Sequence, residues 1–174
     1  MLPFVDHCRR VEAHLTSRYG IRIITRDIPD PLLGDLDGAE IHVDHAVTPE
    51  QRLFLLAHLF GHTAQWNAFP HTMAVGQLHP PPVPEPLLAD ILAYEAEAAR
   101  IALGMLHEIG ITDGDQWLSD YTAADVAYLS HFYRTGEKRE FESFLTTGAP
   151  LLRPGPVPAF SAKRRALRAD GIVI

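Results

Sequence analysis

The sequence predicts an α+β fold, with a small sheet of two to four strands packed on a histidine-bearing helix and a mainly helical C-terminal half. Residues 21–27 and 39–45 alternate apolar and polar side chains, as half-buried strands do. Several longer segments instead repeat apolar residues at helical spacing. The chain has 174 residues, 47% of them hydrophobic, which fits one domain with a substantial core.

The first elements are a helix over residues 3–18 and two strands. The helix ends at Gly20 and carries one apolar stripe, which consists of Phe4, Cys8, Val11 and Leu15. Residues 28–38, between the strands, are rich in Pro, Gly and Asp, which predicts turns with a short strand at their centre. We expect the resulting sheet to be antiparallel or mixed.

The next helix begins with a clear start signal in the stretch "TPEQRLFLLAHLFGHTAQW". Thr48 is suited to cap the helix, Pro49 fits its first turn, and Gln51 completes a T-x-x-Q capping box. The apolar pattern continues to Asn67, and Pro70 follows shortly afterwards. Two histidines lie on this expected helix.

The C-terminal half is predicted to be mainly helical. Residues 68–86 contain a run of prolines, which favours an extended connection that covers a site. Three helices are expected, from Pro86 to Gly110, over 122–136, and a shorter one within 137–148. We therefore predict a single domain over residues 1–150 and a Pro- and Gly-rich, then basic, arm over residues 151–174.

Composition argues against several classes of function. The net charge is −7, with no long basic run in the first two-thirds, so we expect no nucleic-acid partner. The single cysteine, Cys8, allows neither a disulfide framework nor a cysteine zinc knuckle. No signal pattern is visible, and no apolar run approaches the roughly 20 residues that span a bilayer. We expect a soluble, cytoplasmic protein without a membrane partner. The sequence leaves open whether it forms a homodimer.

His58 and His62 stand four residues apart, so a helix brings both imidazoles to one face. That spacing allows two histidines to bind one metal ion. Gly61, directly before His62, costs a helix about 1 kcal/mol relative to alanine, which indicates close approach by another element. We expect that element to supply a third ligand.

Glu95 is the preferred third ligand, because it lies on an otherwise apolar stripe of the helix after Pro86. A carboxylate in that setting must be paired, protonated or bound to a cation. Glu97, offset by about 200° around the helix, is the alternative ligand. His58, His62 and Glu95 would form a two-histidine, one-carboxylate site with open positions, as catalytic sites have. The competing interpretation is a pair of satisfied core histidines beside an unrelated carboxylate.

The histidine helix reads T-P-E-Q-R-x-x-x-L-A-H-x-x-G-H, and an E-x-x-A-x-x-x-A helix follows it. This order resembles the ImmA/IrrE family of zincin-like metallopeptidases, whose members typically read L-A-H-E-L-G-H and then E-x-x-A-N-x-F-A. The match covers residues 1–108. The resemblance implies a zincin-like fold, zinc held by His58, His62 and Glu95, and cytoplasmic proteolysis.

The chain departs from this family at Leu59, where the family's pattern has glutamate. In zincins that glutamate accepts a proton from water and delivers it to the leaving group. Proton transfer of this kind is worth about 10²–10⁴-fold in rate. Leucine cannot transfer a proton, so a conventional peptidase is disfavoured. Other groups that could replace the base are Glu97, Tyr94, Tyr128 and His131.

Three functions stay open, and we favour the first. It is a metal-dependent enzyme with different chemistry that acts on a small-molecule or peptide substrate. Its metal would be zinc, with iron or another divalent transition metal as the alternative, because two histidines and a carboxylate suit these ions. The second is a zinc metallopeptidase with a substituted base. The third is a pseudoenzyme that binds a peptide or partner in the cleft that was formerly the active site.

Overall fold

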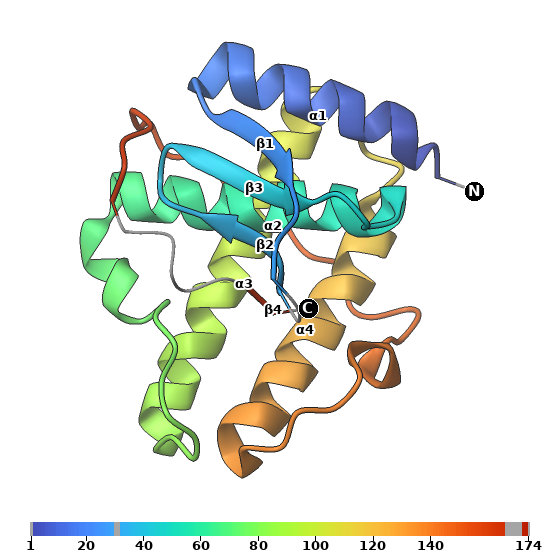
Figure 1. Cartoon of the computed structure of the whole chain (residues 1–174). Helices are drawn as coiled ribbons and strands as arrows, with labels where there is room; N and C mark the ends of the chain where they lie inside the picture. Colours follow the sequence, from blue (N-terminus) through green and yellow to red (C-terminus); the bar gives the residue numbers. More distant parts are fainter. Residues whose placement is uncertain (1, 30–31, 166–171, 174) are drawn as a thin grey trace.

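A computed structural model describes residues 2–29, 32–165 and 172–173 of the chain. It has an α+β fold in which one helix, α2 (Pro49–Ala68), contacts helices α1 (Phe4–Tyr19) and α3 (Glu85–Glu108) as well as the sheet. Helices α3 and α4 (Asp115–Thr135) pack together and extend away from the sheet (Figure 1). The predicted fold class is confirmed at this level.

The sheet is mixed and small. Strand β3 (Glu40–Asp44) lies between β1 (Arg22–Arg26), to which it is parallel, and β2 (Leu32–Leu36), to which it is antiparallel. The short strand expected between the two alternating segments is therefore present as β2. A two-residue strand, β4 (Ile172–Val173), pairs antiparallel with the other edge of β2.

Helix α2 begins with the predicted capping box. The Gln51 backbone N–H donates to Thr48 Oγ1 at 3.2 Å, and the Thr48 N–H donates to Gln51 Oε1 at 2.9 Å. Every residue from Leu53 to Asn67 is buried. A helix buried on all sides must form the centre of a domain, so polar side chains on it need partners from neighbouring elements.

The connection between α2 and α3 contains a short 3-10 helix, η1 (Pro70–Ala74), and then runs without regular structure. A Cβ atom added at Gly76 would lie 2.4 Å from the Tyr94 hydroxyl oxygen, so the connection passes directly over this side chain. The backbone N–H of Val83 donates to the carbonyl of Tyr133 at 2.9 Å and joins the connection to α4.

Helix α4 starts at Asp115, and the expected start at residue 122 is wrong by two turns. The early turns are held by tertiary contacts that a short apolar pattern does not reveal. The Trp117 ring packs on Phe4 of α1 at a centroid distance of 5.6 Å, and its indole N–H donates to Glu50 at 3.0 Å. The shorter helix expected within 137–148 is a single 3-10 turn, η2 (Phe141–Phe144).

The described part of the expected arm, residues 151–165, packs on the domain without regular structure. The backbone N–H of Leu152 donates to Ser119 Oγ at 3.0 Å, and the N–H of Gly155 donates to the Arg100 carbonyl at 2.7 Å. The remainder of the arm, apart from β4, lies outside the described residues. Within the described part of the chain, no helix has both the length and the apolar character that crossing a membrane requires.

Candidate metal centre

Helices α2 and α3 make backbone contact at Gly61. A Cβ atom added there would lie 2.3 Å from the carbonyl oxygen of Ala98, closer than any side chain tolerates. The close approach that the sequence predicts at Gly61 is therefore present, and α3 is the approaching element. One turn before Ala98 on this helix lies Glu95, which the contact brings beside the histidine face of α2.

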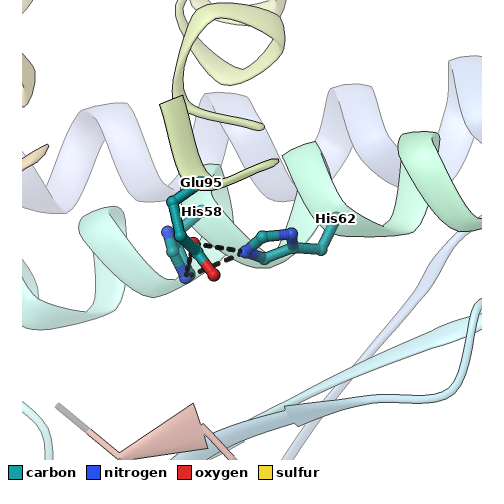
Figure 2. A group of neighbouring side chains, drawn as sticks. All are labelled: His58, His62 and Glu95. Carbon is teal, nitrogen blue, oxygen red and sulfur yellow. Dashed lines mark hydrogen bonds and ion pairs between the residues drawn. The ribbon is translucent and has the colours of Figure 1, made fainter. Parts of the chain in front are cut away.

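The side chains of His58, His62 and Glu95 point toward one another (Figure 2). Their donor atoms converge within 4.8 Å. Glu95 Oε2 lies 2.9 Å from His62 Nε2 and 3.7 Å from His58 Nε2, and the two imidazole Nε2 atoms are 3.2 Å apart. Ligands bound tetrahedrally to zinc at about 2.0–2.1 Å lie about 3.3 Å apart, so this spacing fits such an ion.

Burial and the neighbouring Glu95 together set the protonation of the two imidazoles. His58 and His62 are 7% and 3% exposed. Burial, together with the positive charge of His62, lowers the pKa of His58 to about 4 despite the nearby Glu95 carboxylate, so His58 is neutral at pH 7. Burial also acts to lower the pKa of His62, but the charge and hydrogen bond of Glu95 raise it above its ordinary value. A neutral imidazole is the form that binds a metal.

Gln65, which the sequence analysis missed, orients His62. Its amide N–H₂ donates to the Tyr94 carbonyl at 3.0 Å and to Glu97 Oε2 at 3.3 Å, so its oxygen must face His62 Nδ1, 3.0 Å away. His62 Nδ1 therefore carries a proton, and Nε2 is turned toward Glu95. Outer groups of this kind commonly fix the tautomer of metal-binding histidines. The position of Gln65, three residues after His62 on the same helix, was the signal for this contact in the sequence.

Two candidate bases border the centre without joining the three donors. The Tyr94 ring stacks on His62 at a centroid distance of 4.6 Å, and its hydroxyl accepts a hydrogen bond from the Trp66 indole at 2.7 Å. Burial raises the pKa of Tyr94, so its hydroxyl stays protonated at pH 7. Glu97 faces Gln65, and the donor cluster contains Glu95 in its place.

The other two candidate bases lie on α4 and contact residues of the following segment. Tyr128 is buried between Phe141 and Phe144 and lines a hollow of about 390 Å³ near the start of α2. His131 Nε2 lies 3.2 Å from Glu137 Oε2 near the end of the helix. Neither contact concerns a candidate ligand.

Leu59 is fully buried and packs under the sheet. A Cβ atom added at Gly34 of β2 would lie 3.0 Å from Leu59 Cδ1 and 2.9 Å from Leu55 Cδ2. The backbone of β2 therefore lies directly on these two leucines. Position 59, where the zincin pattern has glutamate, is therefore buried in water-free packing between α2 and β2.

Asp125 on α4 is a further buried carboxyl that the sequence analysis missed. It is 7% exposed. Burial and the negative charge of Glu95 raise the pKa of Asp125 to about 8, while the positive charge of His62 opposes the shift. Leu118 and Thr122 precede it at helical spacing on the buried face. That pattern was hidden because the helix was expected to begin only at residue 122.

Comparisons with known proteins identify no relative of this chain. No protein-family model matches it, and neither the curated proteins nor the solved structures contain a significant match. The function of the centre therefore has to be inferred from its own geometry.

Proposed function

We propose that the protein binds one divalent transition-metal ion, with zinc preferred, through His58, His62 and Glu95, and that it is a metal-dependent enzyme. Its reaction differs from that of a conventional zincin peptidase, because Leu59 cannot act as a base. The supporting observation is the convergence of three donor atoms, from two buried histidines and the partly buried Glu95, on two helices whose spacing depends on Gly61. The substrate is a small molecule or a peptide.

A bound cation explains this cluster better than a satisfied core does. Without a cation, His58 Nε2 and His62 Nε2 face each other at 3.2 Å, and only one proton can lie between them. Glu95 Oε2 lies 2.9 Å from the same His62 Nε2, so a single proton there has to serve both His58 and the carboxylate. A divalent ion gives all three donor atoms a partner at once, and its binding adds to the stability of the fold.

Three protein ligands favour a catalytic over a structural site. Structural zinc sites are usually closed by four protein ligands, whereas catalytic sites keep a position open for water or substrate. The metal would supply Lewis-acid chemistry there. Gln65 holds the His62 ring in place, and the stacked Tyr94 ring shields it from water. The element order supports a zincin-like fold and a divergent ImmA/IrrE-like origin as part of this proposal.

A hydrolase with a substituted base is the second candidate, and one observation favours it. Asp125 places a second carboxyl close enough for the charges of Glu95 and His62 to act on it. A pseudoenzyme that binds a peptide or partner would retain the fold but show no metal-dependent turnover.

Elemental analysis of protein purified without an affinity tag should find about one metal ion per chain. His58→Ala and His62→Ala should each lose the ion. Their thermal midpoints should fall by about 5–10 °C relative to the loaded wild type, because ligand binding at 100 Kd contributes about 2.7 kcal/mol.

His131→Ala is the matched control, because His131 pairs with Glu137 instead of the cluster. It should keep its metal. Unchanged metal content in the His58 and His62 variants would place the ion elsewhere and contradict the proposed site.

A further inference from the structure

Asp125 is buried without a partner that compensates for its burial. The side chain is 7% exposed, and its carboxyl group has no hydrogen bond to another described residue, although its oxygens keep a little contact with solvent, since His7 Nδ1 is the one fully closed polar side-chain atom without a partner among the described residues. Burying a polar group without a hydrogen bond costs about 1–3 kcal/mol, and more if the group is charged. A carboxyl retained at this cost indicates a partner that binds beside it.

A chain of ring contacts connects the face of α4 that carries Asp125 to the candidate metal centre. Tyr121, one turn earlier on α4, packs on Phe54 of α2 at a centroid distance of 4.9 Å. The Phe54 ring in turn stacks on His58 at 5.3 Å. Residues four apart share one face of a helix, so Asp125 lies one turn beyond Tyr121 on the same side. The charges of Glu95 and His62 both act on Asp125, and the Asp125 charge in turn acts on His62.

Asp125 interacts electrostatically with Glu95 and His62 without being one of the three donor residues. The group whose donor atoms lie within 4.8 Å of one another contains His58, His62 and Glu95, and among the described residues Asp125 does not join it. Helix α2 therefore supplies two ligands, α3 supplies one, and α4 supplies a carboxyl at the next distance outward. An acceptor outside the ligand set of a catalytic metal holds a water molecule or substrate group between itself and the ion.

Charge balance also favours a second carboxylate. A divalent cation bound by two neutral imidazoles and one carboxylate carries a net charge of about +1 in a buried site, which is costly. The Asp125 carboxylate neutralises that charge. Other groups near the centre are already engaged, since Tyr94 accepts from Trp66 and Glu97 accepts from Gln65.

We propose that Asp125 is the second carboxylate of this centre and the proton acceptor that replaces the glutamate absent at Leu59. This role rests on the proposed function, because it requires an ion held by His58, His62 and Glu95. Asp125 accepts a hydrogen bond from a water molecule on the open side of the site. The reaction class that this arrangement serves is hydrolysis of an ester or amide.

The proton and electron pairs balance in such a reaction. As the water oxygen forms a bond to the carbonyl carbon, its O–H bond breaks and the proton passes to an Asp125 carboxylate oxygen. When the bond from carbon to the leaving oxygen or nitrogen breaks, Asp125 returns that proton to the leaving group. One water molecule is consumed, and Asp125 ends as the carboxylate with which it began.

Asp125→Asn and Asp125→Leu test this role through metal affinity and metal-free stability. Zinc affinity, measured by competition with a chromophoric chelator, should fall about 10- to 100-fold in both variants. In EDTA their thermal midpoints should equal or exceed that of the wild type, because an unpartnered buried carboxyl has been removed. A purely structural residue would lose stability in EDTA and leave zinc affinity unchanged.

Asp120→Asn makes the same chemical change on α4 at a carboxylate that accepts from Gln116 and the Ala149 N–H, and it should leave zinc affinity unchanged. Zinc-dependent hydrolysis of p-nitrophenyl acetate should fall at least 10-fold in Asp125→Asn but not in Asp120→Asn.

Two failures are distinguishable. A wild type that does not bind zinc would overturn the proposed function together with this role. A wild type that binds zinc, with Asp125 variants that match it in affinity and ester hydrolysis, would overturn only the role of Asp125.

Discussion

Gly61→Ala is expected to lower the free energy of unfolding by about 2–3 kcal/mol and to weaken zinc binding in the same protein. Alanine favours a helix over glycine by about 1 kcal/mol, so an isolated helix would gain stability. Here the added Cβ would lie 2.3 Å from the Ala98 carbonyl oxygen. That oxygen belongs to the backbone and cannot rotate away, so α2 and α3 must separate. Glu95 then moves away from His62, and the cluster loses its third donor.

The measurement is denaturant unfolding in EDTA and in zinc, combined with a zinc affinity for each protein. Gly104→Ala is the matched control, because its Cβ would lie 2.0 Å from the Gly155 carbonyl oxygen, away from the candidate ligands. It should lose stability while keeping zinc affinity. At Gly114 the nearest atom would be 3.8 Å away, and alanine should be tolerated. Wild-type zinc affinity in Gly61→Ala would contradict the dependence of the centre on this helix contact.

The parts of the structure that follow from short-range rules were predictable from the sequence. Thr48 and Gln51 cap α2 within one turn, so the start of this helix follows from four residues. The cost of Gly61 in a helix and the apolar stripe around Glu95 each indicated that a second helix approaches. Together they identified three side chains that the structure brings within 4.8 Å.

The parts that depend on distant contacts were not predictable in the same way. The first two turns of α4 mix polar residues with Trp117 and Leu118, and Trp117 holds them against Phe4 and Glu50, far away in the chain. Strand β1 pairs parallel with β3, although β2 comes between them in the sequence, and the alternation of apolar and polar residues alone does not determine this pairing. Asp125 belongs to the same class, because its position beside the centre depends on how α4 packs.

Leu59→Glu restores the residue of the zincin pattern and is expected to destabilise the metal-free protein by about 3 kcal/mol or more. Leu59 is fully buried under Gly34 of β2, so the new carboxylate enters dry packing. Leu59→Met keeps the volume and should cost less than about 1.5 kcal/mol. The penalty for glutamate should shrink in zinc, because a nearby cation stabilises the carboxylate. Thermal unfolding of both variants in EDTA and in zinc measures these differences.

Combining Leu59→Glu with Asp125→Asn distinguishes two possibilities: that the site lacks a general base, or that Asp125 has taken over this role. If Asp125 accepts the proton, the single variant Asp125→Asn loses zinc-dependent ester hydrolysis, and Leu59→Glu in the same chain should restore part of it. Peptide hydrolysis gained by Leu59→Glu alone would mean that the scaffold lacks only its base. An equal penalty for glutamate in EDTA and in zinc would instead show that position 59 does not face the ion. Glutamate at position 59 would then be unable to recover activity. Among the described residues, Asp125 would remain the buried carboxyl outside the ligand set that interacts with the centre.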